Sequence, residues 1–391
     1  MSSITERHGM KFNIFLSLIS LLITNNVLAD LDQENLSLYW GNGKLEHKSD
    51  FTQVTTSTDD NYFIVADVEN LNLNLSKDNF YFKFKVDEIE NFHGLEIRFS
   101  KKKNSDSYYS YTLPFFTDGD FNSFKQGKWL DYGLSTANLK AVDKPSEQVN
   151  YVSFFLFTKK KPMTFSIKNL STKKKPESGV ISITFDDGYK SQLLAAQIMK
   201  KYDLSATAYI MPRNIGEAGL MTTKEIATLK SYGWDIQSHH AIPLTTMKKE
   251  ELKKEFDFGI DYITKNKFKS ASQHLAYPLG RHNDLVVVET QSHFKTARLA
   301  GGGTETIPPA DPYRIRTFNV LDTTTPEQIK EEIQKAKNHK QWLILMFHYL
   351  NAKPETELQY TPNNFEQFCK YLKESGASVL TIDQAFRKYL K

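Results

Sequence analysis

Cysteine is almost absent, since Cys369 is the only one among 391 residues. An intramolecular disulfide is therefore impossible, and zinc sites built from cysteine thiolates are excluded. The chain is 40% hydrophobic and 25% charged, which excludes a collagen-like, a disordered or a polytopic membrane protein. An excess of either charge is also lacking. Lys and Arg number 50 against 46 Asp and Glu, so the composition does not indicate a nucleic-acid partner.

Long apolar runs are lacking except near the N-terminus, at residues 12–23. Lys11 precedes this run, and the small-residue sequence Val27-Leu28-Ala29 follows it. The order of charge, short apolar run and small residues predicts a signal peptide, 1–29, that is cleaved after Ala29. The alternative, a membrane anchor, would need a longer run to cross about 30 Å of hydrocarbon. We therefore expect a secreted or periplasmic protein without stable membrane insertion.

The length favours two domains, because a single core rarely exceeds about 250–300 residues. Residues 30–172 have the period of two that is typical of half-buried strands. Phe80, Phe82 and Phe84, for example, alternate with polar or amphipathic residues. Many short strands with turn residues between them predict an antiparallel, jelly-roll-like β-sandwich. Its aromatic residues could stack on sugar rings or simply fill the core; the candidates are Trp40, Trp129, Tyr108, Tyr109 and Tyr111.

A lysine-rich linker is predicted at 173–178, and the pattern changes from Gly179 onward. Apolar strands now alternate with amphipathic helices through 179–391, which is typical of parallel strands joined by crossover helices. We favour a distorted (β/α) barrel over a doubly wound sheet. The strands are expected at Val180–Phe185, 206–211, 234–237, 274–277, 296–299, 343–347 and 378–381.

Chemically active side chains follow four of these strands. They are Asp186 and Asp187, then His239 and His240, then the segment around Leu279, and finally His348. In a barrel, the carboxyl ends of the strands meet at one rim, where active sites lie. Carboxylates and imidazoles gathered there suit a divalent metal and an acid–base pair, with Zn²⁺ the first choice because no thiolate is near.

The motifs at these ends resemble those of the polysaccharide deacetylase (NodB-homology) family of carbohydrate esterases. Residues 184–188, TFDDG, resemble the first motif of the family, and 275–280, LAYPLG, resemble its third. Residues 343–348, LILMFH, resemble its last motif, and the similarity extends through most of 179–391. The resemblance implies the distorted barrel fold and the metal-assisted hydrolysis of acetyl groups on a sugar.

The resemblance also implies a role for each residue. Asp186 would be the general base and His348 the general acid. Asp187 and His239 would bind the metal ion, and the backbone N–H of Leu279 would stabilise the oxyanion.

The histidine motif departs from the family pattern. The family has two histidines four residues apart, but the position four after His239 is Pro243. His240 is the natural substitute as the third metal ligand, although neighbouring side chains on an extended segment point to opposite faces. His274 and His282 are further candidates, and a site with two ligands or none remains open.

A second departure concerns the arginine that supports the base in the family. Ala276 occupies its position, so Arg314 or Arg316 is expected to supply the charge. Asp322 is expected to orient His348.

Together these features predict a metal-dependent hydrolase that removes acetyl groups, foremost N-acetyl groups, from an envelope or extracellular polysaccharide. One alternative is a non-catalytic carbohydrate-binding protein with an eroded metal site. Another is an O-acetyl carbohydrate esterase with the same residues.

Overall fold

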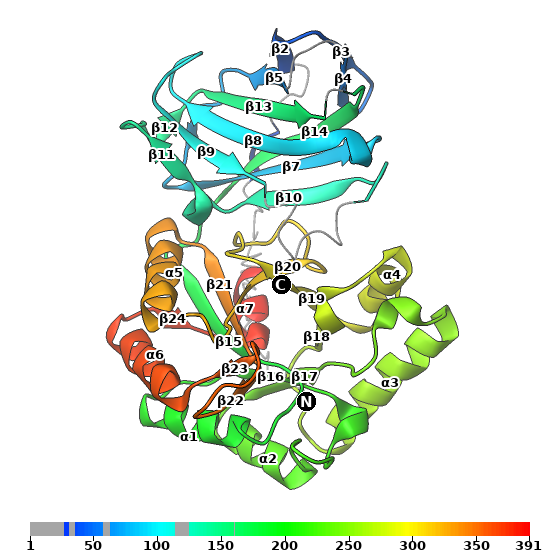
Figure 1. Ribbon diagram of the computed structural model, residues 1–391, viewed down its shortest axis with the longest axis vertical. Coiled ribbons are helices and arrows are strands. Elements are labelled where there is room, and N and C mark those ends of the chain that lie inside the picture. The colour runs from blue at the N-terminus through cyan, green and yellow to red at the C-terminus, as the bar shows by residue number, and fades with distance from the viewer. Residues whose placement is uncertain (1–26, 31–35, 58–62, 114–124, 160) are drawn as a thin grey trace, which may run out of the picture.

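The computed structural model describes residues 27–30, 36–57, 63–113, 125–159 and 161–391. They form two parts, an N-terminal β-sandwich and a C-terminal barrel (Figure 1). The predicted signal peptide lies outside the described residues except for 27–29, which belong to the strand β1. Among the residues that the structure describes, no helix has the length and apolar character that crossing a membrane requires.

The sandwich consists of two six-stranded antiparallel sheets, which confirms the predicted all-β domain. One sheet has the order β10-β7-β14-β4-β3, with β1 also paired to β14. Its strands are β1 (Val27–Asp30), β3 (Gly43–His47), β4 (Thr52–Thr56), β7 (Asp78–Val86), β10 (Leu130–Leu134) and β14 (Thr164–Lys174). The second sheet has the order β11-β9-β8-β13-β5-β2. Its strands are β2 (Leu36–Trp40), β5 (Phe63–Val68), β8 (Phe92–Ser100), β9 (Tyr108–Thr112), β11 (Lys140–Val142) and β13 (Tyr151–Thr158). The short strands β6 (Leu73–Asn74) and β12 (Gln148–Val149) pair with each other.

The apolar side chains of β7 point into the core, as the alternating sequence predicts. Phe80, Phe82 and Phe84 are fully buried between the sheets. Tyr81, on the opposite face, is buried as well, because the barrel lies against it. Its hydroxyl donates to the carbonyl of Pro308 in the barrel at 2.8 Å. This outer face is therefore covered by the second domain rather than by water.

The barrel is a closed ring of seven parallel strands, which confirms the predicted barrel fold. Its strand at 315–319 was not among the expected strands, and the expected strand at 378–381 lies outside the ring. Its order is β16-β17-β18-β19-β20-β21-β15, and a β15–β16 pairing closes the ring, with β24 attached to β15. The strands are β15 (Val180–Phe185), β16 (Thr207–Ile210), β17 (Asp235–Ser238), β18 (His274–Ala276), β19 (Thr296–Gly302), β20 (Ile315–Asn319), β21 (Trp342–Phe347) and β24 (Ser378–Val379). Two short strands, β22 (Tyr349–Leu350) and β23 (Gln359–Tyr360), pair outside the ring.

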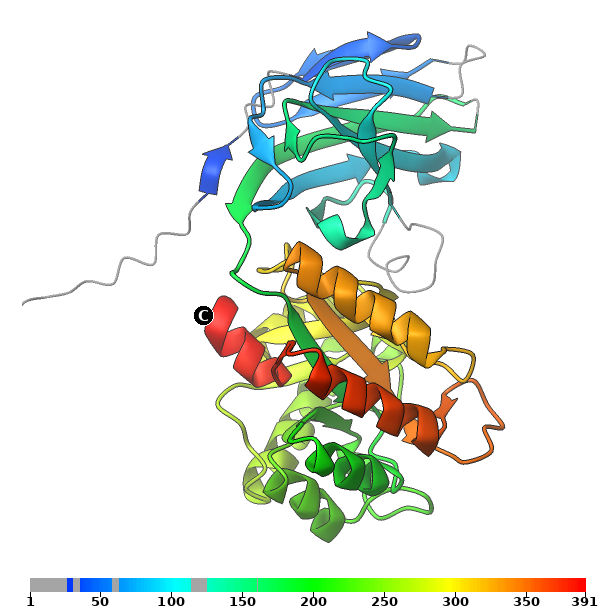
Figure 2. The same cartoon turned by 90° about the vertical axis from the view of Figure 1, so that its left-hand side faces the viewer.

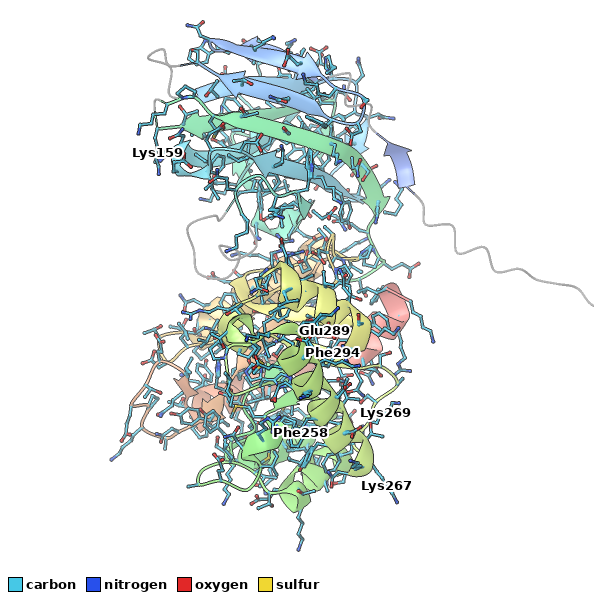
Figure 3. The ribbon with its side chains drawn as sticks, turned by 90° about the vertical axis from the view of Figure 1, so that its right-hand side faces the viewer. Lys159, Phe258, Lys267, Lys269, Glu289 and Phe294 are labelled. Atoms are coloured by element: carbon cyan, nitrogen blue, oxygen red, sulfur yellow. The ribbon has the colours of Figure 1, made fainter. Side chains whose placement is uncertain are left out.

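Helices surround the barrel, and α3 and α4 cover the side shown in Figure 3. They are α1 (Gln192–Lys201), α2 (Thr223–Ser231), α3 (Lys249–Lys265), α4 (Asp284–His293), α5 (Pro326–His339), α6 (Pro362–Glu374) and α7 (Ile382–Tyr389). Local sequence fixes where several of them begin. Thr222 and Glu225 form a capping box at the start of α2, and Thr325 with Gln328 does the same for α5, where Pro326 takes the first helical position.

The two domains meet at the amino ends of the barrel strands. β14 continues to Lys174, so the first two residues of the predicted linker belong to the sandwich. β15 begins five residues later and runs away from the sandwich, so its carboxyl end lies at the far side of the barrel (Figure 2). The rim that is expected to carry the chemistry therefore faces away from the N-terminal domain.

A buried ion pair joins the domains. Arg316 on β20 contacts Glu305 with Nη2–Oε1 and Nε–Oε2 distances of 2.5 and 3.0 Å. Its Nη1 and Nη2 atoms also donate to the Tyr132 hydroxyl at 2.9 Å and the Gly133 carbonyl at 2.7 Å, both in the sandwich. β10 approaches so closely that a Cβ atom at Gly133 would lie 2.5 Å from Oγ1 of Thr306.

Removal of this cation is expected to destabilise the protein strongly. Arg316→Met should lower the free energy of unfolding by about 3–5 kcal/mol, because Glu305 would remain as an uncompensated buried charge. Lys128→Met is the matched control, since it breaks an exposed interdomain pair with Asp284 and should cost less than about 1 kcal/mol. Urea unfolding followed by circular dichroism measures both, and equal small losses would contradict the role of Arg316.

Candidate functional site

The predicted residues converge on the carboxyl rim of the barrel. Asp186 and Asp187 follow β15, His239 follows β17, and His348 follows β21. The Asp186 N–H donates to the carbonyl of Phe347 at 3.0 Å, which continues the β15–β21 pairing to the rim. The parallel register therefore brings residues that are 162 positions apart (348 − 186) to neighbouring strand ends.

A sharp turn places the two aspartates differently. Asp187 has a positive φ of 68°, and so has Gly188, with 83°. The buried Gln192 on α1 holds this turn, because its Nε2 atom donates to the Asp186 carbonyl at 2.6 Å and to the His348 carbonyl at 3.0 Å. One amide side chain thus ties the first and the last of these strand ends together.

Asp187 and His239 face each other, with 3.4 Å between Oδ1 and Nε2. His239 Nδ1 lies 2.8 Å from the carbonyl oxygen of Ala276, which can only accept, so Nδ1 carries a hydrogen. Nε2 and the carboxylate are then both acceptors unless a proton or a cation lies between them. A backbone carbonyl that orients the second nitrogen is also the usual arrangement of metal-binding histidines.

In this pair, the charge on each side chain favours the charged form of the other. Burial opposes a charge on the imidazole, but the hydrogen bond to Asp187 and the charges of both aspartates outweigh it, so the pKa of His239 is raised. Burial also disfavours the Asp187 carboxylate, yet His239, His348 and Arg298 together hold the pKa of Asp187 below its usual value. Without an ion between them, the two groups therefore favour each other's charged form despite their burial.

Asp186 has a different partner, Arg298. The side chains of both are almost fully buried, and Nη2 of Arg298 donates to Oδ1 of Asp186. Nη1 donates to the Leu299 carbonyl at 3.1 Å, and the guanidinium lies 4.7 Å from the ring centre of Tyr209. Arg298 on β19 therefore supplies the positive charge beside Asp186 that the family pattern would provide from the position of Ala276.

This finding corrects the prediction that Arg314 or Arg316 supplies the charge. Arg314 pairs with Asp311, and Arg316 pairs with Glu305 in the domain interface. The sequence does contain a signal for Arg298, because it is the one charged side chain within an otherwise small and apolar predicted strand, 296–299. A charge in such a strand needs a buried partner.

His348 is half-buried, and its ring interacts electrostatically with both aspartates. Burial lowers the pKa of His348, although Asp186 and Asp187 oppose this. Within 161–391, all of which the structure describes, Nδ1 of His348 has no hydrogen-bond partner. Asp322 therefore does not orient it through that atom; the Asp322 N–H donates to the Glu357 carbonyl at 2.9 Å.

Leu279 lies on the same rim, directly beyond β18. Its backbone is in the left-handed region, with φ 55° and ψ 18°, and its side chain is 67% exposed. Since the Leu279 side chain is mostly exposed, this residue can contribute to the site only through its backbone.

His240 lies elsewhere, and this corrects its prediction as the third ligand. Its Nδ1 atom is 3.0 Å from Oε1 of Glu255 on α3, and its ring packs against Phe256 at 5.6 Å. α3 covers the outside of the barrel, where Figure 3 labels Phe258. The physical reason is the alternation of the extended chain, which turns His240 outward when His239 points inward.

The other two histidine candidates are also remote. His274 Nε2 lies 3.5 Å from Oδ1 of Asp383 on α7, at the beginning of β18 rather than its end. Nε2 of His282 accepts from Nε of Arg314 at 3.2 Å, and its ring stacks on Tyr277. Neither residue approaches the Asp187–His239 pair through these contacts.

Comparison with known proteins assigns this part of the chain. The sequence profile of the polysaccharide deacetylase family matches residues 173–296, from the end of β14 to the beginning of β19. Residues 173–296 therefore match a polysaccharide deacetylase domain. The match includes Asp186, Asp187, His239 and Leu279, and it ends before Arg298 and His348. The resemblance seen in the motifs is thereby confirmed.

Individual relatives are distant. YxkH of Bacillus subtilis (strain 168), named as a candidate polysaccharide deacetylase, is 30% identical over 125 residues, which are 29% of this chain and 42% of YxkH. The chain thus spans less than half the length of this curated relative. A family 4 acetyl xylan esterase from Clostridium thermocellum, solved with a cobalt ion, is 18% identical with a TM-score of 0.40, over 54% of this chain and 91% of that one. A family 4 pseudoenzyme from Bacillus anthracis is 17% identical with a TM-score of 0.39, over 54% and 66%.

The deacetylase domain supplies only part of a zinc site. Asp187 and His239 offer one carboxylate and one imidazole, oriented toward each other. Catalytic zinc normally has three protein ligands and an open position. Among the described residues, which include the whole domain, no third His, Cys, Asp or Glu completes such a group. The fit to a three-ligand ion is therefore incomplete.

One residue at the rim was not foreseen, Tyr189. Its ring lies 4.4 Å from that of Tyr349, the residue after His348. Burial and the neighbouring charge of Asp187 raise the pKa of Tyr189 to about 12, so its hydroxyl stays protonated at neutral pH. It thus adds a hydrogen-bond donor beside the aspartate pair.

The pairing of Arg298 with Asp186 gives a prediction on stability. Arg298→Leu should lower the free energy of unfolding by about 3–5 kcal/mol, because the carboxylate would stay buried without its cation. Arg298→Lys should recover part of this loss, since it keeps the charge and loses the planar fork. Thermal unfolding measures both variants. Arg314→Leu, at a more exposed pair, is the control, and a loss equal to that of Arg298→Leu would contradict the assignment.

Proposed function

We propose that the deacetylase domain hydrolyses acetyl groups on an acetylated polysaccharide, foremost N-acetyl groups on a glycan of the cell envelope or outside the cell. The observation that carries this proposal is the pairing of Asp186 with Arg298 next to the Asp187–His239 pair on one rim. Family membership supports hydrolytic chemistry of this kind.

The chain's own residues suggest the steps. Asp186, paired with Arg298, takes a proton from the attacking water. His348 protonates the leaving nitrogen, and because its pKa is lowered by burial, its imidazolium gives up a proton readily. The backbone N–H of Leu279 is proposed to donate to the oxygen on which negative charge develops.

The first test is acetate release from N-acetylglucosamine oligomers with and without added zinc. Asp186→Asn should reduce the rate by about 10²–10⁴, because the general base is lost while the fold is kept. Asp322→Asn is the control and should retain the parent rate, since Asp322 lies outside the proposed chemistry. A parent rate in Asp186→Asn would refute the role of Asp186.

Zinc is proposed as the ion that Asp187 and His239 hold. Asp187→Asn and His239→Ala should each weaken zinc binding by at least about tenfold, whereas His240→Gln should bind zinc like the parent because His240 faces Glu255. Titration of the dialysed protein with a competing zinc indicator measures this. Loss of zinc binding in His240→Gln would contradict this assignment. It would support His240 as the third ligand, as the motif alone suggested.

The incomplete ligand set favours one alternative, a non-catalytic carbohydrate-binding protein on the same fold. A parent protein that releases no acetate from either amides or esters, with zinc present, would support it. Release of acetate from acetylated xylan but not from N-acetylglucosamine oligomers would instead support the O-acetyl esterase.

Export is proposed from the N-terminal signal pattern. β1 (Val27–Asp30) pairs with β14, so cleavage after Ala29 would remove most of this edge strand and leave the other five strands of the sheet. N-terminal sequencing of the protein released by cells should begin at Asp30. Detection of residues 12–23 on the mature protein would contradict the cleaved signal.

A further inference from the structure

The outer face of one sandwich sheet contains a cavity of about 370 Å³. The sheet is the one with the order β11-β9-β8-β13-β5-β2, whose strands β8 and β9 lie in front of β7 in Figure 1. Residues from all six of its strands line the cavity, among them Tyr39, Arg98, Tyr108, Ser153 and Phe155. A volume of this size falls within the range of about 300–1,000 Å³ that is typical of small-molecule sites.

Aromatic rings and an arginine form the centre of this cavity. The Arg98 guanidinium lies 3.9 Å from the ring centre of Phe155 and 4.5 Å from that of Tyr108. Two hydrogen bonds to Glu96, from Nε at 2.7 Å and from Nη2 at 3.2 Å, fix its plane. Within the described residues no bond uses Nη1, so this nitrogen is left to donate to a ligand. Tyr39, 43% exposed, adds a third ring at the edge.

The floor beside these rings is polar. Ser153 on β13 lines the cavity between Arg98 on β8 and Asp67 on β5, which are its partners across the sheet. Asp67 is 2% exposed, and its Oδ1 atom is buried without a hydrogen-bond partner in the described part of the chain. Burial raises the pKa of Asp67, although a hydrogen bond with Ser153 opposes this. A buried acceptor of this kind gains stability from any donor that reaches it.

We propose that this cavity binds a saccharide, with one sugar ring packed against the aromatic side chains and its hydroxyl groups bonded to the Arg98–Ser153 row. A sugar ring offers C–H groups on its faces and hydroxyl donors and acceptors around its edge, which matches rings beside a planar arginine and polar oxygens. The ion pair with Glu96 compensates the charge of Arg98, which favours a neutral sugar over an anion.

This site is distinct from the deacetylase rim. The barrel strands start at the sandwich and carry their active residues at the opposite end (Figure 2). The cavity therefore does not hold the reacting sugar; it anchors the chain to a glycan at another place. The saccharide site is independent of the proposed catalysis, because binding to it can be measured in a variant that lacks the base Asp186.

The structure also corrects the earlier list of sugar-stacking candidates. Of those residues only Tyr108 lines the cavity. Tyr111 is buried in the sandwich core with its hydroxyl 2.7 Å from that of Tyr132. Trp129 belongs to the other sheet, where it packs against Phe51 and lies under the Lys168 ammonium group at 4.4 Å.

The test uses the full chain with Asp186→Asn, so that no probe is hydrolysed. Isothermal titration with tetramers of β-1,4-linked N-acetylglucosamine, glucose and xylose should detect at least one ligand with a Kd of about 1 mM or below. Tyr108→Ala and Arg98→Lys should each weaken this binding about tenfold, through the lost ring and the lost planar donor. Trp129→Ala is the matched control, a half-buried aromatic residue under a lysine outside the cavity, and should bind like the parent.

Thermal unfolding of each variant separates lost binding from lost folding. Weaker binding in Tyr108→Ala or Arg98→Lys with an unchanged melting temperature supports the site. The proposal is overturned if no tetramer binds, if both cavity variants bind like the parent, or if Trp129→Ala alone loses binding. Acetate release by the chain with intact Asp186 is recorded separately, so a failed saccharide site and a failed deacetylase proposal give different results.

Discussion

Parallel pairing around a closed ring is the constraint on which the candidate site depends. Every neighbouring pair in the ring is parallel, and β15 closes it by pairing with both β16 and β21, so all carboxyl ends meet at one rim. Asp186, His239 and His348 are distant in the sequence and come together only through this closure. The same constraint places the amino ends of the strands at the opposite rim, where the sandwich packs.

Buried charge is handled in the same way at both ends. Arg298 meets Asp186 near the reactive rim, and Arg316 meets Glu305 at the sandwich. Arg316 also donates to the Tyr132 hydroxyl and the Gly133 carbonyl, and Arg298 donates to the Leu299 carbonyl, which offsets part of the cost of removing the charges from water. The first pair places a guanidinium beside the carboxylate that is proposed as the base. The second fixes the orientation of two domains that share only a short connection.

The proposed saccharide site and the proposed catalytic site lie on separate surfaces of the two domains. The sandwich carries a saccharide-sized cavity on one sheet, and the barrel carries acid–base residues on its far rim. Each surface uses the same physical means, polar groups held in fixed positions by burial. At the rim the groups include an acid–base set, which suits hydrolysis, whereas the cavity combines the rings of Tyr39, Tyr108 and Phe155 with polar side chains, which suits binding without reaction. The incomplete ligand set of the rim makes the activity of the barrel the decisive measurement.

Local pattern in the amino-acid sequence was sufficient for the two domains, most strands and helices, and the position of Asp186, Asp187, His239, Leu279 and His348 at strand ends. Periods of two and of about 3.6 residues report which face of an element is buried, and strand ends follow from where those periods stop. Three features required the folded structure: the outward direction of His240, the choice of Arg298 over Arg314 and Arg316, and the cavity around Arg98. The direction of His240 depends on whether the chain stays extended after β17, and its contact with Glu255 shows that it does. The other two features depend on contacts between segments far apart in the chain, and periodicity within one segment carries no information about which distant side chain completes a buried charge or a binding surface.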